Sequence, residues 1–423
     1  MTKDYDVIII GGGPAGMMAA ARASELGAKV LLLEKNDALG KKMLITGGGR
    51  CNLTNDANLE ETIANIPGNG KFVYSALHQF SGQDLRSLLE KLGLRTKVEE
   101  KGRVFPVSDQ AADVVNTLVK YLQRQGVTLC YQTSVDSLQI ENGNCQGVWV
   151  GDQLLPAKAV VMATGGLSYP KTGSTGEGHK MVKTAGHTIT PLFPSAVAIT
   201  CNDLWIVQRE VQGVSLPRVT ITLYRENGKV LASEAGDIII THWGLSGPGA
   251  LRLGRVVALA CAKGQGPLRG EIDLFPGHTW QSLEEVIKGK AATGSKRTLK
   301  NILSTILPER LCKVLITLAH LNSECPFEKL TRPSLESLVL LMKALPIRIT
   351  GTRPLVEATV TAGGVHIKEI NPRTMASKLI QRLFFAGEII DVDAHTGGFN
   401  MQVAFSTGYV AGEAAASLAK EGT

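Results

Sequence analysis

The hydrophobic pattern at the start of the chain predicts a strand, a tight turn, a helix and a second strand. Residues 7–10 are continuously apolar, residues 14–25 are rich in alanine, and residues 29–33 are largely apolar again. The turn before the helix carries Gly11, Gly13 and Gly16 in the spacing G-x-G-x-x-G. In this context the glycines permit a tight turn and a close approach of the backbone to a pyrophosphate. The pattern therefore predicts a dinucleotide-binding βαβ unit.

The second strand of this unit ends on an acidic residue. Glu34 lies eighteen residues after Gly16, where a carboxylate can accept hydrogen bonds from the two hydroxyls of a ribose. An acid at this point favours FAD or NAD over NADP, whose 2′-phosphate needs a basic partner. The start of the helix adds free N–H groups that can hold the phosphates.

The pattern changes in the middle of the chain. Between Pro194 and about Phe275 apolar and polar residues alternate with period two, which predicts antiparallel strands. Asn227-Gly228 separates two of these runs and is a strong hairpin signal. Residues 278–345 then follow helical spacing, so a β domain followed by a helical segment is expected.

Continuous apolar runs on both sides of this region predict further strands of the first domain. Residues 159–163 run into Thr164-Gly165-Gly166, and residues 383–386 run into Gly387-Glu388. Uninterrupted apolarity is typical of central parallel strands. We therefore predict an α/β protein with a discontinuous Rossmann-type domain at 1–193 and 352–423, an inserted mainly antiparallel β domain at 194–275 and 346–351, and a small basic helical subdomain at 276–345.

The formal net charge is +7, and its location is more informative than its size. Residues 281–348 hold eleven Lys and Arg against six Glu. Such an excess is either a solvated face or a surface that attracts phosphate backbones. The five bases that form an acid-free run, and that would contact such a phosphate backbone, are Lys288, Lys290, Lys296, Arg297 and Lys300.

Other bulk properties argue against several classes of protein. No apolar run approaches the roughly 20 residues that span a bilayer, and the first strand begins too early to leave room for a signal peptide. We therefore expect a cytoplasmic protein without a membrane partner. The seven cysteines include no C-x-x-C pair, and the histidines lack metal-binding spacing, so neither a disulfide framework nor a metal site is expected.

A glycine-dense loop at residues 46–52 reads TGGGRCN. Its glycines permit close contact with a ligand, to which Arg50 and Asn52 can donate hydrogen bonds. Cys51 is either a proton donor or a packing residue, depending on its thiol. Tyr169 and Lys171 precede a second glycine-rich turn and are either proton donors or surface residues. The candidate catalytic residues are therefore Arg50, Cys51, Tyr169 and Lys171.

Several segments in fixed order carry a resemblance to one bacterial family. They are GGGPAG at 11–16, GKKMLITGGGRCNLTN at 40–55, ATGG at 163–166, TGSTGEGH at 172–179 and FAGEIIDVDAHTGGFNMQ at 385–402. Together they resemble the YhiN/BaiN-like family of FAD-dependent oxidoreductases, which is distantly related to fumarate reductase flavoprotein subunits. The resemblance covers nearly the whole chain, and GGGRCN and TGGFNMQ are specific to that family.

The resemblance implies a bound FAD with contacts along these segments. The start of the last helix would face the flavin, where its partial positive charge would stabilise the reduced ring. Glu388 stands where many Rossmann flavoproteins have Asp. The implied cofactor contacts are Gly11, Gly13, Ala15 and Gly16 for the pyrophosphate, Glu34 for the ribose, Val135 for the adenine, and Lys35, Lys42, Gly49, Arg50, Cys51, Asn52, Thr164, Gly165, Gly387, Glu388, Gly398, Asn400 and Met401 elsewhere.

Family members are associated with reduction of enone steroids, with conversion of uridine to dihydrouridine in large-subunit ribosomal RNA, and with amine oxidation. We expect a reductase of an activated C=C bond, and the basic helical segment favours the RNA substrate. No second G-x-G-x-x-G follows a strand, so the electron donor either docks transiently, as NAD(P)H would, or is another protein. The alternatives are a small-molecule enone reductase, an amine oxidase, and a non-catalytic flavin-holding RNA-binding factor.

Overall fold

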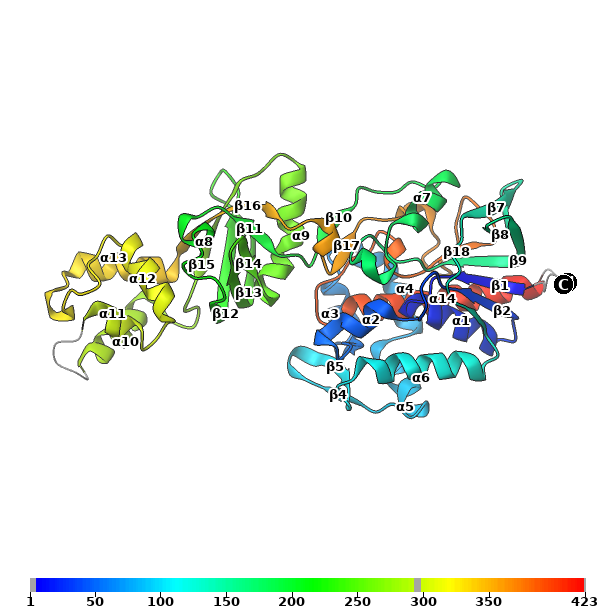
Figure 1. The fold of residues 1–423 in the computed structure, drawn as a ribbon, viewed down its shortest axis with the longest axis horizontal. Helices are drawn as coiled ribbons and strands as arrows, with labels where there is room; N and C mark the ends of the chain where they lie inside the picture. The colour runs from blue at the N-terminus through cyan, green and yellow to red at the C-terminus, as the bar shows by residue number, and fades with distance from the viewer. Residues whose placement is uncertain (1–4, 293–297, 422–423) are drawn as a thin grey trace. The chain divides into compact units, whose positions relative to one another are not determined.

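The structure is a computed structural model of the 423-residue chain, and it describes residues 5–292 and 298–421. The chain forms two compact units (Figure 1). Unit 1 comprises Met1–Phe193 and Leu355–Thr423, and unit 2 comprises Pro194–Pro354. Within the described part of the chain, no helix is both long and apolar enough to cross a membrane.

Unit 1 is built on a sheet whose central strands are parallel. β1 (Tyr5–Ile10) lies between β2 (Val30–Leu33) and β9 (Gln153–Met162), and β6 (Thr128–Cys130) and β18 (Leu383–Phe385) extend the sheet on the two sides. The register brings the carboxyl ends of the central strands to one edge of the sheet. In an open α/β sheet this is the edge where ligands bind.

The sheet also has an antiparallel extension. The first half of β9 pairs with β8 (Asn144–Val150), which pairs with β7 (Ser137–Glu141). The second half of β9 pairs with β1 and β18, so this one long strand joins the two parts of the sheet.

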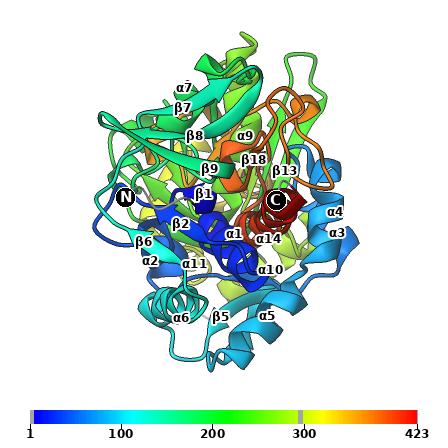
Figure 2. The same ribbon diagram turned by 90° about the vertical axis from the view of Figure 1, so that its right-hand side faces the viewer.

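Two helices that are far apart in the sequence pack closely in unit 1. α1 (Pro14–Glu25) and α14 (Phe399–Glu421) lie side by side in Figure 2. A Cβ added at Gly408 or at Gly412 of α14 would lie 2.3 Å from a carbonyl oxygen of α1. Glycine at these two positions therefore lets the helix backbones approach.

Shorter elements connect these layers of unit 1. They are α2 (Lys41–Ile45), η1 (Thr46–Gly48), β3 (Thr54–Asn55), α3 (Leu59–Ala64), η2 (Gly70–Val73), α4 (Tyr74–Gln79), α5 (Gly82–Lys91), β4 (Thr96–Val98), η3 (Glu100–Gly102), β5 (Arg103–Pro106), α6 (Ala111–Arg124), η4 (Pro170–Thr172), α7 (Glu177–Thr184), η6 (Leu355–Glu357), β17 (Val360–Ala362), η7 (Ile367–Glu369) and η8 (Gly387–Ile389). β10 (Phe193–Ser195) lies where the chain passes into unit 2.

Unit 2 contains a closed antiparallel barrel. Buried and exposed residues alternate along its long strands, as the period-two pattern predicts. Asn227-Gly228 lies in the turn of the longest hairpin. The strands follow the order β11 (Ile199–Cys201), β14 (Gly244–Ser246), β13 (Val230–Thr241), β12 (Ser215–Tyr224), β15 (Leu268–Asp273) and β16 (Leu345–Thr352), and β16 pairs with β11.

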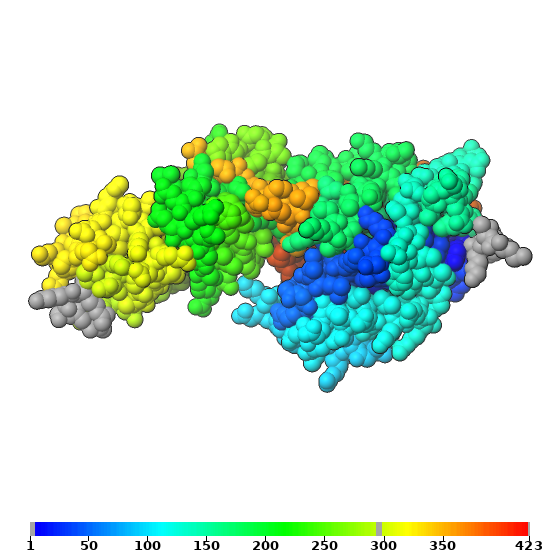
Figure 3. Space-filling view, viewed as in Figure 1, coloured from blue at the N-terminus to red at the C-terminus, as the bar shows by residue number. Residues whose placement is uncertain are grey.

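The helices of unit 2 share one hydrophobic cluster with the barrel. Residues of α12, α13 and the segment between them form the surface coloured yellow in Figure 3. The predicted separation of 276–345 as a subdomain of its own stays a prediction. The helices are α8 (Leu204–Val207), α9 (Pro248–Ala262), α10 (Trp280–Ala292), α11 (Leu299–Leu303), α12 (Glu309–Leu318), η5 (Phe327–Lys329) and α13 (Arg332–Lys343).

Candidate active site

The glycine turn between β1 and α1 has the shape that a pyrophosphate needs. A Cβ on Gly11 would lie 2.5 Å from Ala163 O, and a Cβ on Gly16 would lie 1.8 Å from Gly11 O, so close packing requires glycine at both positions. Gly13 immediately precedes α1, and a Cβ there would meet no described atom within 4 Å. This open side next to the helix start fits a bound pyrophosphate.

Glu34 is buried at the end of β2 and is held by three hydrogen bonds. Its Oε2 accepts from Gly12 N at 2.7 Å, and its Oε1 accepts from Asn36 N at 2.8 Å and from Asn36 Nδ2 at 2.7 Å. A carboxylate has about four acceptor sites, so one is left for a ribose hydroxyl. The chain after β6 passes beside this group, because Thr133 N donates to Glu34 O at 2.9 Å, and Val135 lies buried two residues later.

Lys35 ties the second glycine-rich turn to this edge of the sheet. Its Nζ donates to Thr175 Oγ1 and to Glu177 Oε2, each at 2.7 Å. The next residue, Asn36, donates to Thr172 O at 3.2 Å. The structure thus places Lys35 as a link to residues 172–177, a role that the local sequence around it does not predict.

Glu388 is the centre of a polar network. Its Oε2 accepts from Lys42 Nζ at 2.9 Å, and its Oε1 accepts from Thr361 N at 2.7 Å and from Ser168 Oγ at 3.2 Å. Burial alone would raise the pKa of this carboxyl, but Lys42 and the Thr361 N–H outweigh burial and hold the pKa below its ordinary value. Glu388 is therefore ionised, and its side chain is fixed by the protein.

The glycine-dense loop adopts the left-handed conformation over several residues. Residues 47–49 have φ values of +58°, +70° and +85°, and Cys51 has φ +64°. A Cβ on Gly48 or Gly49 would meet no described atom within 4 Å. Asn52 anchors the loop. In the side-chain orientation that satisfies both its amide nitrogen and its amide oxygen, the oxygen accepts from Gly398 N at 3.0 Å.

Neither Cys51 nor Arg50 is arranged for proton transfer. Cys51 is fully buried, and burial raises the pKa of its thiol to about 12, the opposite of an activated thiol. Arg50 Nη1 donates to Glu99 Oε1 at 2.8 Å and to Asp109 Oδ1 at 3.3 Å, and the guanidinium lies 3.9 Å from the centre of the Phe105 ring. Cys51 thus fits the packing alternative, and Arg50 holds the loop to residues 99–109.

The start of α14 is fixed by close backbone contacts. A Cβ on Gly398 would lie 2.2 Å from Thr54 O, so this approach requires glycine. The Asn400 side chain is turned into the preceding loop, where its Nδ2 donates to Ala394 O at 2.7 Å and its Oδ1 accepts from Ala394 N at 2.9 Å. Asn400 can therefore contact a cofactor through its backbone.

Gly387 and Met401 are two further residues that the resemblance implies as cofactor contacts. Gly387 has φ +76°, and its N–H donates to Thr407 Oγ1 of α14 at 2.9 Å. A Cβ on Gly387 would lie 2.8 Å from the Cβ of buried Ala15. Met401 is partly buried against the core of unit 1. These contacts join the end of β18 to the start of α1 and to the body of α14.

The loop after β9 holds the remaining candidates. Thr164 Oγ1 is buried and has no hydrogen-bond partner among the described residues, so it is available to a ligand. The next residue, Gly165, has φ +73°. Tyr169 has φ +53° and is 38% exposed, and Lys171 is exposed two residues later. Of the four candidate proton donors, Tyr169 and Lys171 are the ones with exposed side chains.

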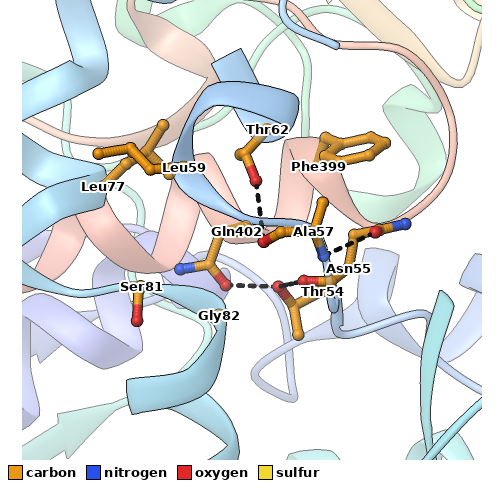
Figure 4. A pocket seen from close by; sticks show the side chains of 10 residues that line it. All are labelled: Thr54, Asn55, Ala57, Leu59, Thr62, Leu77, Ser81, Gly82, Phe399 and Gln402. Atoms are coloured by element: carbon orange, nitrogen blue, oxygen red, sulfur yellow. Dashed lines mark hydrogen bonds between the residues drawn. The ribbon is translucent and has the colours of Figure 1, made fainter. Parts of the chain in front are cut away.

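A small cavity lies beside the first turn of α14 (Figure 4). Its volume is about 40 Å³, and its lining includes Phe399, Gly82 and the pair Thr54 and Gln402, in which Thr54 Oγ1 donates to Gln402 Oε1 at 2.7 Å. This volume admits a few water molecules but no uridine or sterol. The cavity is therefore not the substrate site.

A polar network in unit 1, centred on buried His187, was not foreseen from the sequence. Ser377 Oγ lies 3.0 Å from His187 Nε2, and His187 Nδ1 lies 3.2 Å from Glu369 Oε2, an order that resembles a hydrolase triad. Ser377 Oγ, however, also accepts from Leu379 N at 3.1 Å and from Ile380 N at 2.9 Å, so its lone pairs are occupied. We interpret the network of Ser377, His187 and Glu369 as a clamp that fixes the segment before β18.

The bases predicted to contact RNA belong to unit 2. Lys288 Nζ lies 2.5 Å from a glutamate oxygen one turn earlier on α10, and Lys300 Nζ lies 2.9 Å from a glutamate oxygen of α12. Ion pairs on the surface are weak and can open. Lys290 is exposed, whereas Lys296 and Arg297 lie outside the described residues.

The parallel sheet, the glycine turn and the acidic residue at the end of β2 define a Rossmann-type dinucleotide-binding protein. Solved flavoprotein structures share this fold. The open conformation of a flavocytochrome c3 fumarate reductase matches with a TM-score of 0.52 at 19% identity, covering 99% of this chain and 79% of that one. A 3-ketosteroid-delta4-(5alpha)-dehydrogenase from Rhodococcus jostii matches with a TM-score of 0.52 at 16% identity, covering 98% and 97%.

The chain belongs to the family described as HI0933-like protein Rossmann domain, which it matches over residues 5–414. The 3-dehydro-bile acid delta(4,6)-reductase of Clostridium scindens is 32% identical over 413 residues, 96% of this chain and 98% of that protein. The ribosomal RNA dihydrouridine synthase of Haemophilus influenzae is 32% identical over 413 residues, 97% and 98% of the two chains.

These comparisons confirm the predicted family and fold class. The chain is an oxidoreductase with a Rossmann-type domain of the FAD-binding kind. The roles of individual side chains in binding and catalysis stay predictions.

Proposed function

We propose that this protein is an FAD-dependent reductase of an activated C=C bond and that its substrate is uridine in large-subunit ribosomal RNA. The edge of the unit 1 sheet at which the central strands have their carboxyl ends is called the cofactor edge below. It supports the redox part of the proposal, because Gly13, Glu34 and the start of α14 are placed there as a bound dinucleotide requires. The names of two relatives, from Haemophilus influenzae and Escherichia coli, support the RNA substrate. The observation that carries it is the cation excess at 281–348, which suits a phosphate backbone.

When bound, FAD would supply a hydride from its N5 to one carbon of the uracil C5=C6 bond, after reduction by NAD(P)H that docks transiently. The second carbon then needs a proton from the protein. Tyr169 is our first candidate, because its side chain is exposed and its backbone has the unusual φ of +53° next to the Ser168–Glu388 network. Lys171 is the second candidate.

The protein must also hold the cofactor and the RNA. Glu34 and the backbone around Gly13 would bind the adenosine ribose and the pyrophosphate. Thr164 Oγ1, which is buried without a described partner, would donate to the cofactor. Lys288, Lys290 and Lys300 would contact phosphates of a cytoplasmic ribosomal RNA, with the target base turned out of its stack.

A small-molecule enone is the second candidate substrate. The bile acid reductase has the same identity to this chain as the RNA enzyme of Haemophilus influenzae. In addition, Lys288 and Lys300 are paired with glutamates, which lowers the positive charge that an RNA would meet.

Mass spectrometry of nuclease-digested ribosomal RNA tests the proposal. Deletion of the gene should remove one dihydrouridine, which carries two hydrogens more than uridine, and a plasmid copy should restore it. A copy carrying Gly13→Ala, which should fold but bind less FAD, serves as a cofactor-defective control. An unchanged digest, together with enone reduction by the purified FAD-loaded protein, would move the assignment to the small-molecule substrate.

A further inference from the structure

Trp280 differs from the other tryptophans of the chain in its exposure. It is the first residue of α10 and is 42% exposed. The other three have partners inside the protein: Trp205 is buried, the Trp149 indole donates to Gln139 Oε1 at 2.8 Å, and the Arg353 guanidinium lies 5.3 Å from the centre of the Trp243 ring. Trp280 therefore presents a large flat apolar side chain to solvent.

The turn that carries Trp280 is held by several hydrogen bonds. Thr279 Oγ1 accepts from Ser282 N at 3.2 Å and so caps the start of α10. The residues just before α10 are held by Lys343 of α13, whose Nζ donates to Phe275 O at 2.8 Å and to His278 O at 2.6 Å. An aromatic side chain on such a fixed turn can bind a flat ligand with little loss of conformational entropy.

Trp280 shares one face of α10 with a candidate RNA contact. Trp280, Glu284 and Lys288 follow one another at intervals of four residues, so their side chains lie along one side of the helix. Glu284 is the glutamate that pairs with Lys288. Leu283 and Ile287 are buried and belong to the face that packs on the core. Lys288, with more than half of its side chain exposed, lies about 12 Å from Trp280 along the helix axis.

We infer that Trp280 stacks on a base of a single-stranded segment of the RNA substrate, while Lys288 contacts a phosphate of the same strand. Aromatic side chains next to cations are the arrangement by which proteins bind single-stranded nucleic acids, because every base offers a flat face. Residues 281–348 as a whole hold eleven Lys and Arg against six Glu, and this excess favours a polyanion as the ligand of this segment of the chain. The inference rests on the proposed RNA substrate and adds the residue that would engage an unpaired base.

The test is the binding of a fluorescein-labelled oligouridine to the full-length, FAD-loaded protein, followed by fluorescence anisotropy. Trp280→Ala should weaken binding by about 5- to 150-fold, and Trp280→Phe should keep most of the affinity. The slope of affinity against salt should be unchanged in Trp280→Ala but shallower in Lys288→Ala, because only the lysine releases counterions. Leu204→Ala, which removes a 71% exposed apolar side chain of unit 2 outside α10, is the matched control and should bind like the wild type.

Different failures separate this inference from the proposed function. Equal affinity of wild type and Trp280→Ala, with wild-type binding intact, overturns the stacking role and leaves the RNA substrate standing. The stacking role is also overturned if Trp280→Phe loses as much affinity as Trp280→Ala while both keep the wild-type melting temperature. A wild-type protein that does not bind oligouridine or ribosomal RNA overturns both proposals.

Discussion

Two carboxylates at the cofactor edge of unit 1 and the candidate RNA-binding lysines of unit 2 are held in opposite ways. In unit 1, Glu34 and Glu388 are each fixed by three hydrogen bonds, and most of the donors are buried or partly buried. In unit 2, Lys288 and Lys300 make single ion pairs at the surface. Buried networks fix one geometry, whereas surface pairs exchange readily with solvent and with phosphates.

This difference fits the two tasks that the proposed function requires. A redox cofactor needs groups that are in place before it binds, because reorganisation would cost affinity and rate. An RNA surface needs cations that can leave one partner for another, since its contacts are set by charge rather than by exact fit. We therefore expect mutations in unit 1 to change chemistry and cofactor content, and mutations in unit 2 to change salt-dependent binding.

Removing the proposed proton donor should have the largest effect. Tyr169→Phe should lower the rate of substrate reduction by about 10²- to 10⁴-fold, because a positioned acid contributes about that factor. FAD content and RNA affinity should stay at wild-type values. The measurement is single-turnover reoxidation of the pre-reduced protein by its substrate. A wild-type rate in Tyr169→Phe combined with a large loss in Lys171→Gln would assign the role to Lys171.

A pair of glycine substitutions separates folding from cofactor binding in unit 1. Gly16→Ala should lower the free energy of unfolding by about 3 kcal/mol or more, because the new Cβ would lie 1.8 Å from Gly11 O. Gly13→Ala should leave the unfolding of the FAD-free protein almost unchanged, since its Cβ meets no described atom within 4 Å, but should reduce bound FAD. Urea unfolding and the flavin-to-protein absorbance ratio measure the two effects. Full FAD content in Gly13→Ala would contradict the pyrophosphate site.

The parts of the site that depend on local spacing were predictable from the sequence. Gly11, Gly13 and Gly16 lie in one turn, and Glu34 ends the strand that the pattern predicts, so a short segment carries the whole signal. The alternation along β12 and β13 likewise identified the antiparallel strands of unit 2.

Contacts between distant segments were not predictable in this way. Lys42 and Glu388 are 346 residues apart, and His187 and Ser377 are 190 apart, so no spacing in the sequence links them. The burial of Cys51 also depends on segments that fold around the loop and not on its neighbours in the sequence. A single sequence shows which residues could do chemistry, but the long-range packing decides which of them are free to do it.

The clamp formed by His187 should give unit 1 a pH-dependent stability. Burial lowers the pKa of His187 below 6.5, and Glu369 opposes this only in part. Below about pH 6.5 the unfolded chain therefore binds a proton that the folded protein does not, so the free energy of unfolding falls as the pH drops. The decline should be at most about 1.4 kcal/mol per pH unit for this group.

Urea unfolding at several pH values between 5 and 8 measures this slope. His187→Gln should reduce it, and His179, whose pKa burial also lowers, should account for part of what remains. The His187 ring packs edge-on against the Phe385 ring, with 4.9 Å between the ring centres. Phe385 lies two residues before Gly387, a predicted cofactor contact, so the variant should also bind FAD less tightly. Equal slopes in wild type and variant would show that the clamp does not titrate.

The smallest effect expected concerns the surface pairs of unit 2, and it is a gain of binding. Glu309 lies 2.9 Å from Lys300 Nζ and 3.7 Å from Lys313 Nζ, so Glu309→Gln frees two ammonium groups for phosphates. RNA affinity should rise by about 2- to 5-fold at low salt, in line with the strength of exposed ion pairs, and the gain should vanish at high salt. Glu60→Gln removes the same charge from an exposed position of unit 1 and should leave affinity unchanged. An equal gain in both variants would mean that net charge alone governs RNA binding, and the division of tasks between the two units would then not hold.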